Sequence, residues 1–302
     1  MDVVKLIPAI KDYIWSGTKL AKMGKPSPNG KIAETWELSF LNDGPSIIAN
    51  GINKGKCLKD IATKEDIGTI PASFPMFPVL IKLIDAGSNL SVQVHPSDSY
   101  ALKNENQFGK TEMWHVIEAD KGCGLYVGLK QDYTKTDIEK ALKEGHILDL
   151  LNFFEVKAGD TYFIPSGTIH AIGKGVTLIE IQQSSTLTYR LYDYDRVDKN
   201  GNKRELHIEK ALKVIDTSKY KKKEFENNCI GSCKYFSSYR NSFNGEKEIE
   251  NDETSFSSIT FLDGEGLVND IPYKKLDTFF IPANKKATLK GNGIYILTKL
   301  VK

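Results

Sequence analysis

The stretch GDTYFIPSGTIHAIG, residues 159–173, carries the pattern that decides the fold. Its first half is rich in aromatic and β-branched residues, as strands are, and it ends in the corner Pro165-Ser166-Gly167. Proline and glycine fix tight turns, and a strand that leaves such a corner aims His170 into the mouth of a barrel. The stretch therefore predicts two strands, a tight turn and a candidate functional histidine.

Short strands of the same kind follow one another along most of the chain. They are rich in β-branched and aromatic residues and are bounded by Gly, Pro, Asn or Asp. They occupy residues 33–40, 77–85, 90–96, 112–119, 123–129, 153–165, 176–183 and 187–195. This pattern predicts an all-β dominated fold that closes as a barrel or sandwich. Short helical inserts are expected at residues 134–146 and 206–216, where apolar residues share one helix face.

The length of 302 residues favours two domains. The polar and basic segment TSKYKKKEFENN, residues 217–228, is interpreted as a solvated linker at the boundary. The segment GDTYFIPSG, residues 159–167, returns as LDTFFIPAN, residues 276–284, which indicates a duplicated β unit. We therefore predict a catalytic, metal-binding domain with helical inserts at residues 1–216 and a degenerate copy at residues 217–302.

The second copy differs from the first where chemistry is expected. At the same offset of 117 residues, His170 corresponds to Ala287 and Glu180 to Leu297. The second copy is therefore expected to keep the scaffold and to lack the polar site.

Composition excludes several classes of partner. Lys and Arg number 41 against 39 Asp and Glu, so nothing in the net charge of +2 points to nucleic acid or to an anionic membrane. The N-terminus lacks the features of a secretory signal, and the richest apolar run, residues 74–84, is short and interrupted by Lys82. We expect a cytoplasmic protein without nucleic-acid or membrane partners. The cysteines are too sparse for a disulfide framework and are expected to be free thiols: Cys57, Cys123, Cys229 and Cys233.

Four residues form a candidate metal site. Gln93 and His95 share one face of a strand, although this pair alone is explained as well by a hydrogen-bonded pair on a solvent-facing strand. Glu112 starts a strand of Trp, Val and Ile, where a buried carboxylate needs a cation or several donors. With His170 these residues offer nitrogen and oxygen ligands that suit zinc or a similar divalent ion. His115 has the opposite parity to Glu112 and is not expected to join them.

The remaining histidines, His146 and His207, lie at helix ends, where a capping or surface role is expected.

Basic residues interrupt strands near the candidate ligands. Lys110 shares the face of Glu112, and Lys82 and Arg190 each interrupt an apolar or aromatic strand. One such residue would normally extend to solvent, but three together predict a pocket for an anionic substrate, with a phosphate as the obvious candidate.

Two further polar residues belong to the same candidate pocket. Ser91 has the parity of Gln93 and offers a hydroxyl donor, and Glu180, flanked by isoleucines, is a candidate general base.

With these residues assembled, the chain resembles the type I mannose-6-phosphate isomerases in their short bacterial form. The spacing from Gly159 to His170 matches the second motif of the cupin barrels. The resemblance is dense over about the first 216 residues and is carried by segments that occur in order. They are IWSGTKLA, AETWELSF, FPVLIKLIDAGSNLSVQVHPSD, GKTEMWHVIEA, IPSGTIHAIG, LTYRLYDYDR and RELHIEKALKVID.

The resemblance implies tandem cupin-like jelly-roll barrels and an enzyme that interconverts D-mannose 6-phosphate and D-fructose 6-phosphate through an enediolate. It implies one zinc ion per chain, with Gln93, His95, Glu112 and His170 as ligands. It further implies catalytic roles for Arg190, Glu180 and Lys110, and substrate contacts from Ser91, Lys82 and Lys110. The Gln-x-His pair replaces the His-x-His of general cupins, and the large helical insertion of the longer enzymes is missing.

Several alternatives stay open at this point. The general base is Glu180, Lys110 or a metal-bound hydroxide, because an arginine stays protonated at neutral pH. An iron-dependent cupin oxygenase would need two histidines and one carboxylate, which this chain also has, although the basic residues argue against it. A sugar-sensing or storage cupin without catalysis is a third class. The oligomeric state, monomer or homodimer, is not indicated.

Overall fold

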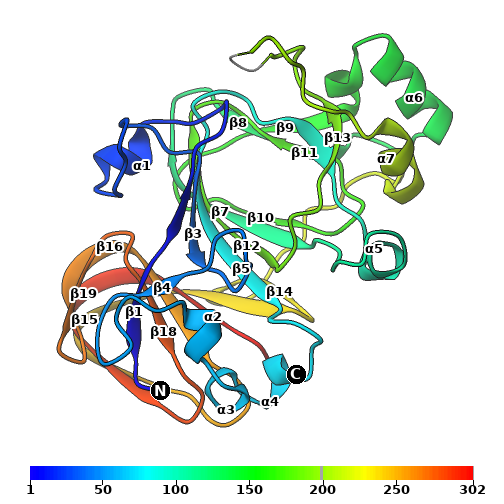
Figure 1. Ribbon diagram of the computed structural model, residues 1–302. Coiled ribbons are helices and arrows are strands. Elements are labelled where there is room, and N and C mark those ends of the chain that lie inside the picture. Colours follow the sequence, from blue (N-terminus) through cyan, green and yellow to red (C-terminus); the bar gives the residue numbers. More distant parts are fainter. Residues whose placement is uncertain (198–199, 302) are drawn as a thin grey trace.

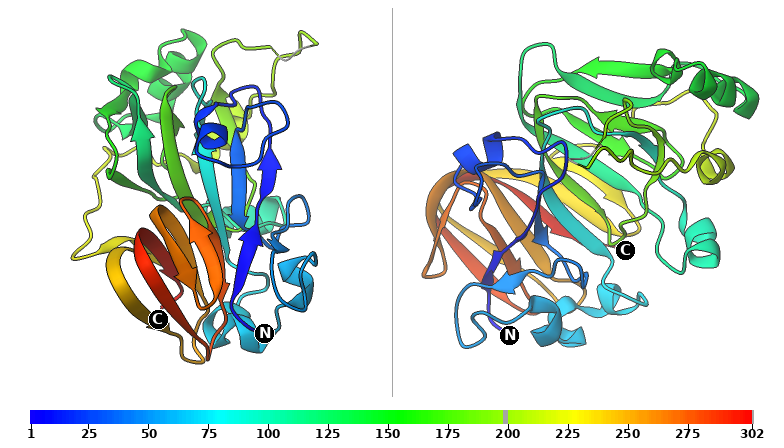
Figure 2. Two further views of the ribbon diagram at one scale, coloured as in Figure 1. Left: turned by 90° about the vertical axis from the view of Figure 1, so that its left-hand side faces the viewer. Right: turned by 45° about the horizontal axis from the view of Figure 1, so that its top comes forward.

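The computed structural model describes residues 1–197 and 200–301, and it builds them into two neighbouring β units (Figure 1). The first unit, mostly cyan to green in Figure 1, consists of two sheets, and the second unit, mostly orange to red, consists of one strongly curved sheet. Figure 2 shows the two units lying against each other in both further views. The predicted fold, dominated by strands and of the tandem cupin type, is confirmed. No helix in the described part of the chain is long and apolar enough to cross a membrane.

The first unit pairs a six-stranded with a five-stranded antiparallel sheet. The six-stranded sheet has the order β10-β7-β12-β5-β3-β2, and the five-stranded sheet has the order β13-β6-β11-β8-β9. Their strands are β2 (Ala9–Lys11), β3 (Glu34–Leu38), β5 (Val79–Asp85), β6 (Val92–Val94), β7 (Glu112–Ala119), β8 (Gly124–Leu129), β9 (Leu151–Glu155), β10 (Thr161–Ile164), β11 (His170–Ile172), β12 (Val176–Gln183) and β13 (Tyr189–Tyr192). Each segment predicted to hold a strand contains at least one of them.

The second unit is an eight-stranded sheet with the order β14-β15-β19-β16-β18-β1-β4, in which β17 pairs with β16. Its strands are β1 (Val4–Ile7), β4 (Ile47–Ile48), β14 (Cys229–Cys233), β15 (Phe236–Glu250), β16 (Ser257–Val268), β17 (Ile271–Lys274), β18 (Thr278–Ile281) and β19 (Lys286–Lys299). Two of these strands, β1 and β4, come from the N-terminal part of the chain. The domain boundary at residue 217 stays a prediction. Strands β1 and β4 precede this boundary in the sequence, but they belong to the sheet whose other strands follow it.

Short helices lie around the sheets, and the last of them, at residues 208–214, packs against β13 and β6. They are α1 (Lys19–Lys22), α2 (Leu58–Ile61), α3 (Lys64–Ile67), α4 (Thr69–Ala72), α5 (Asp98–Asn104), α6 (Lys135–Lys143), η1 (Ile147–Leu150) and α7 (Ile208–Val214). Both predicted inserts are confirmed as α6 and α7. Helix α6 begins at a capping box in which Thr134 Oγ1 accepts from the Asp137 amide at 3.2 Å, and Asp137 accepts from the Thr134 amide at 2.8 Å. The remaining helices are a turn or two long, too short to show a periodic apolar face.

The two copies of the repeated segment form matching strands, as the offset of 117 residues predicts. β10 and β18 occupy equivalent positions, and the turn before each contains an aspartate with the same contact. Asp160 Oδ2 accepts from the Lys157 amide at 2.9 Å, and Asp277 Oδ2 accepts from the Lys274 amide at 2.8 Å. The residue before each aspartate has a positive φ, 94° at Gly159 and 68° at Leu276.

Strand pairing also identifies the residues of the second unit that correspond to Glu112 and Glu180 of the first. Glu112 pairs with Ile164 in the first unit, and Ser257 pairs with the equivalent Ile281 in the second. Glu180 pairs with Trp114, and Leu297 pairs with Ile259. A serine and a leucine therefore replace the two carboxylates.

The largest apolar core lies between the two units. Met113, Phe163 and Ile181 of the first unit belong to the same buried cluster as Phe236 and Phe280 of the second. These residues alternate with the polar ones along β7 and β12, so one face of the six-stranded sheet packs against the second unit. The opposite face, which carries Glu112 and Glu180, points into the first barrel.

Candidate metal centre and cavity

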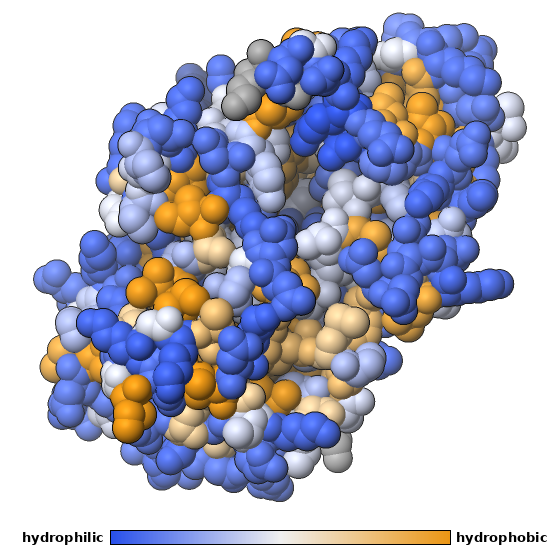
Figure 3. All heavy atoms as spheres, in the orientation of Figure 1, coloured by the Kyte–Doolittle hydropathy of each residue, from blue (hydrophilic) through white to orange (hydrophobic). Residues whose placement is uncertain are grey.

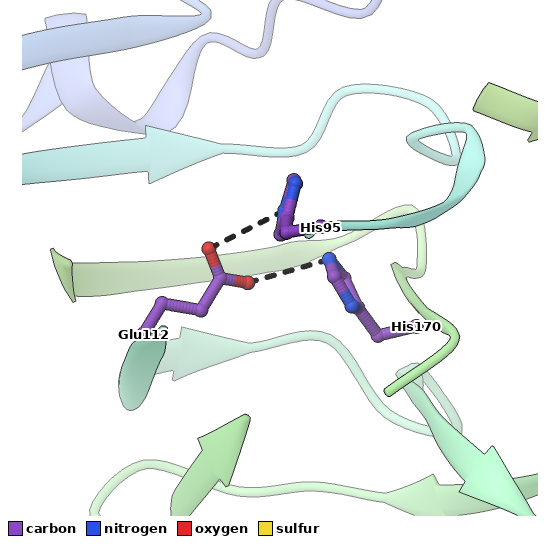
Figure 4. Close-up of side chains that lie close together, drawn as sticks. All are labelled: His95, Glu112 and His170. Atoms are coloured by element: carbon purple, nitrogen blue, oxygen red, sulfur yellow. Dashed lines mark ion pairs between the residues drawn. The ribbon is translucent and has the colours of Figure 1, made fainter. Parts of the chain in front are cut away.

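His95, Glu112 and His170 converge inside the first barrel (Figure 4). Glu112 begins β7, His170 begins β11 and His95 is the residue after β6, so the three side chains come together from two facing sheets. Glu112 Oε1 lies 3.3 Å from His170 Nε2, and Glu112 Oε2 lies 3.6 Å from His95 Nε2. One ligand atom from each residue lies within 4.8 Å of the others. The structure thus brings together three of the four predicted ligands in one cluster.

Backbone carbonyls orient both imidazole rings. His95 Nδ1 donates to Leu187 O at 2.7 Å, and His170 Nδ1 donates to Thr168 O at 2.9 Å, which leaves each Nε2 facing Glu112. Burial and the charge of Lys110 lower the pKa of His95 well below its ordinary value and that of His170 to about 4. Both rings are therefore neutral at neutral pH, which is the form that binds a metal ion.

Glu112 is fully buried, and apart from the Lys110 ammonium group, 2.6 Å from Glu112 Oε2, its carboxylate oxygens have no hydrogen-bond partner among the described residues. Burial, together with the charge of the nearby Glu180, raises the pKa of Glu112, and Lys110 opposes that shift. A buried carboxylate whose Oε1 has no donor among the described residues, set between two oriented imidazoles, suits a bound cation. This donor set of nitrogen and oxygen fits zinc or a similar divalent ion.

Gln93, the fourth predicted ligand, lies beside the cluster. Its amide Nε2 is 3.3 Å from His170 Nε2, and Ser91 Oγ donates to its Oε1 at 3.4 Å. A metal ligand must present the amide oxygen, and a half turn of the nearly symmetric amide exchanges the two atoms. Gln93 is thus close enough to be the fourth metal ligand. It lies next to the cluster because it pairs with His170 across β6 and β11.

Charges of alternating sign cross the six-stranded sheet toward the cluster. Glu34 Oε2 lies 3.4 Å from Lys82 Nζ, and Lys82 Nζ lies 3.3 Å from Glu180 Oε1. Glu180 Oε1 lies 3.6 Å from Lys110 Nζ, which in turn lies 2.6 Å from Glu112 Oε2. Each lysine therefore bridges two carboxylates, which lowers the cost of burying all five charges.

These contacts set the charge state of the row. Burial alone would raise the pKa of Glu180, but Lys110, Lys82 and the Trp114 indole outweigh it, so the pKa of Glu180 is lowered. Burial disfavours a charged Lys82, but Glu34 and Glu180 raise the pKa of Lys82 above its ordinary value. Both side chains are ionised at neutral pH.

A cavity of about 370 Å³ opens beside the cluster. Figure 3 shows the surface hollowed in its upper half, in the region of the first unit. All six predicted residues outside the buried triad line this cavity: Lys82, Ser91, Gln93, Lys110, Glu180 and Arg190. Residues that the sequence did not single out line it as well, among them Tyr13, Glu34, Trp36, Asp43 and Arg204.

Two guanidinium groups face this cavity. Arg190 Nη1 donates to Glu205 O at 2.7 Å, whereas its Nε is buried and has no hydrogen-bond partner among the described residues. Arg204 is held by Asp193, with 2.7 Å between Arg204 Nε and Asp193 Oδ2. Arg204 lies beyond the last predicted strand segment of the first unit, residues 187–195, so the sequence alone did not predict that it lines the cavity.

The other histidines lie apart from the metal cluster. His115 is buried, and its Nδ1 lies 2.8 Å from Thr161 Oγ1 on β10. His146 is exposed, and His207 precedes α7 without a side-chain capping bond, while its backbone amide donates to Arg190 O at 2.7 Å. The predicted exclusion of His115 from the cluster agrees with this placement.

Comparisons with known proteins agree on one family. The family model for the phosphomannose isomerase type I catalytic domain matches residues 3–114. The chain is 35% identical to the mannose-6-phosphate isomerase ManA of Bacillus subtilis strain 168, over 91% of both chains. It superposes on a crystal structure of the mannose 6-phosphate isomerase from Bacillus subtilis with a TM-score of 0.89, covering 99% of each chain at 35% identity.

A more distant structure shares the fold alone. It is a mannose 6-phosphate isomerase bound with zinc and yttrium, at a TM-score of 0.79 and 15% identity, covering 100% of both chains.

Proposed function

The chain belongs to the type I phosphomannose isomerase family of aldose–ketose isomerases, and from this premise we propose that it is a zinc enzyme that interconverts D-mannose 6-phosphate and D-fructose 6-phosphate through an enediolate. The observation that carries the proposal is the buried Glu112, set between His95 and His170 beside a cavity lined by four basic side chains. An oriented metal site and an anion-binding wall in one cavity suit a sugar phosphate.

We propose Gln93, His95, Glu112 and His170 as the residues that hold the zinc ion. When bound, zinc supplies positive charge that polarises the sugar oxygens and stabilises the negative charge of the enediolate. The distant isomerase bound with zinc and yttrium supports this choice. The reaction needs no net oxidation, so a metal without redox chemistry is sufficient.

The anionic end of the substrate is proposed to lie against Arg190 and Arg204. Lys82 and Lys110 each contact two carboxylates, so their charges are largely neutralised. Arg190 keeps a buried Nε without a partner among the described residues, and Arg204 shares a single carboxylate with Arg196. A phosphate group satisfies planar guanidinium donors of this kind.

Isomerisation moves a proton from C2 of the aldose to C1 of the ketose, with the enediolate between the two states. The group that moves this proton must reach the sugar between the metal cluster and the arginines, where Lys110 and Glu180 lie. The lowered pKa of Glu180 makes its carboxylate a weak base at neutral pH. Glu180 nevertheless has the free electron pair that this step needs, whereas Lys110 is an ammonium group between two carboxylates. We therefore assign the proton transfer to the Glu180 carboxylate, and we assign to the Lys110 ammonium group the donation of hydrogen bonds to the sugar oxygens.

The proposal is tested by following the conversion of mannose 6-phosphate in deuterated water. An enediolate route incorporates deuterium at the carbon that receives the proton, at C1 of fructose 6-phosphate and at C2 in the reverse direction. Glucose 6-phosphate serves as the stereochemical control. Conversion without any exchange over many turnovers would favour a hydride shift, and absence of conversion by folded, zinc-loaded protein would remove the proposed function.

A further inference from the structure

A contact from the second unit reaches the segment that carries Lys110. Tyr235 lies in the turn between β14 and β15, and its hydroxyl donates to Asp98 Oδ2 at the start of α5. The two residues are 137 positions apart in the sequence. The contact therefore joins the second unit to α5, which in turn bonds the residue before Lys110.

Asp98 is the centre of a network that fixes three consecutive backbone amides. Asp98 Oδ1 accepts from the Gly109 amide at 2.8 Å and from Gln183 Nε2 at 2.8 Å. Gln183 Oε1 accepts from the Thr111 amide at 2.8 Å. Between them, the Lys110 amide donates to Pro96 O at 3.0 Å.

The position of Lys110 depends on this network because its ammonium group is crowded. Lys110 Nζ lies 2.6 Å from Glu112 Oε2, 3.1 Å from His95 Nε2 and 3.6 Å from Glu180 Oε1. A small displacement of its backbone changes all three distances. In well-oriented sites, displacements of about 1 Å can cost on the order of 100-fold in rate.

The approach of the two chain segments is close. A Cβ atom on Gly109 would lie 2.5 Å from the backbone nitrogen of Asp98, so a glycine is needed for this contact. The rings of Phe74, Phe108 and Tyr235 also pack together, with 5.8 Å between the centroids of Phe74 and Tyr235. A Tyr235 ring without its hydroxyl can therefore keep its packing while the hydrogen bond is removed.

We propose that Tyr235 is a positioning residue for the isomerisation: through Asp98 it fixes the segment 109–111 and so holds Lys110 beside the metal cluster. The second unit thereby contributes to turnover without touching the substrate. This inference rests on the proposed function, because it takes Lys110 to act on the sugar.

The test compares Tyr235→Phe with Tyr273→Phe. Tyr273 is the matched control because its hydroxyl also makes one hydrogen bond in the second unit, to Asn292 O at 2.8 Å, with no link to Asp98. We expect Tyr235→Phe to lower kcat about tenfold, with KM and zinc content unchanged, and to speed amide hydrogen exchange in peptides that contain residues 109–111. Tyr273→Phe should change neither kcat nor that exchange.

A double-variant cycle gives a second readout. If Tyr235 acts through Asp98, Tyr235→Phe combined with Asp98→Asn should be no slower than the slower single variant. Multiplying effects would mean that the two residues act separately, and would overturn the proposal. A wild-type kcat for Tyr235→Phe, or an equal loss for Tyr273→Phe, would overturn it as well.

Hydrogen exchange separates this inference from the proposed function. Wild-type protein that shows no isomerase activity would remove the proposed function and with it the role of Tyr235 in turnover. Unchanged exchange at residues 109–111 in Tyr235→Phe would remove the positioning contact while leaving the isomerase activity in place.

Discussion

The side chains around the cavity divide into those that neutralise one another and those that keep unsatisfied groups. Lys82, Lys110 and Glu180 form contacts with opposite charges on both sides. In contrast, Glu112 Oε1 has no lysine contact and Arg190 Nε has no acceptor, and both atoms are buried without a hydrogen-bond partner in the described part of the chain. Because such atoms cost free energy unless a ligand satisfies them, they mark where the metal ion and the substrate bind.

Replacing Arg190 should separate catalysis from metal binding. Arg190→Ala removes a guanidinium that faces the cavity and leaves the three buried ligands untouched. We expect kcat/KM to fall at least about 100-fold, because the substrate loses a guanidinium that binds its phosphate and orients the sugar, while zinc content stays near that of the wild type. Elemental analysis and initial rates on the same samples measure both.

Arg240→Ala, which removes an exposed arginine from β15, is the control and should retain full activity. Parallel loss of zinc and activity in Arg190→Ala would instead assign Arg190 a structural role.

At the scale of single residues, sequence reasoning found the groups whose chemistry is unusual for their strand. Glu112 and Arg190 interrupt apolar or aromatic segments, so their positions carried a signal. Trp36 and Arg204 line the same cavity without such a signal, because a tryptophan in a strand or an arginine in a loop is ordinary. Their placement depends on how distant segments meet in space.

Strands β7 and β10 show how an element can carry a pH-dependent stability. His115 on β7 contacts Thr161 on β10 and is almost fully buried. Burial, with the charge of Arg240, lowers the pKa of His115 to about 4, against about 6.5 in an unfolded chain. Between these values the unfolded chain binds the additional proton, so the free energy of unfolding falls as the pH decreases from about 6.5 to about 4.

The variant His115→Gln should weaken this dependence. Glutamine keeps a polar group near Thr161 and does not titrate, so between pH 6.5 and 4.5 the variant should lose less stability than the wild type, by about 1 to 3 kcal/mol. Urea unfolding of the metal-free proteins measures this difference without a contribution from metal release.

His146→Gln, which removes an exposed histidine, should leave the pH dependence of the wild type unchanged. An identical slope for His115→Gln and wild type would show that His115 does not contribute.

At the scale of elements, alternation and turn residues predicted most strands of the first unit, though not β2, and the helices α6 and α7. These elements carry their own signals, such as the capping box at Thr134 and the corner at Pro165. Helix α3 also begins at a capping box, of Thr63 and Asp66, but the four-residue helices α1 to α4 were not predicted, because one turn shows no periodicity. The pairing of β1 and β4 with the second unit depends on tertiary contacts, so local sequence could not predict it.

The two units behave as one folded body because they share a core. Met113 and Phe163 of the first unit pack in the same cluster as Phe236, Phe256 and Phe280 of the second. A buried carboxylate also crosses the boundary: Glu37 on β3 accepts from Thr278 Oγ1 on β18 at 3.0 Å. Removing one unit would leave these groups exposed or unpaired.

A chain ending at residue 216 should therefore fail to form a stable enzyme. It loses most strands of the eight-stranded sheet and exposes the shared core, so we expect aggregation or the loss of a cooperative unfolding transition. Co-expression with residues 217–302 should restore soluble protein, because the interface re-forms. Solubility and thermal unfolding report the result, and a soluble, fully active chain of residues 1–216 would contradict the expectation.

We propose that the cluster of His95, Glu112 and His170 holds a zinc ion required for the isomerisation of mannose 6-phosphate. The most direct measurement follows activity and bound zinc together, in protein as purified, after chelation and after zinc is restored. The variant Glu112→Gln is measured in parallel. Glu118→Gln, at an exposed position on the same strand, is the control. We predict that activity falls and returns in proportion to about one zinc ion per chain, that Glu112→Gln binds zinc at least about 100-fold more weakly, and that Glu118→Gln behaves as the wild type. Full activity in folded protein that holds no metal, or unchanged zinc affinity in Glu112→Gln, would contradict the account.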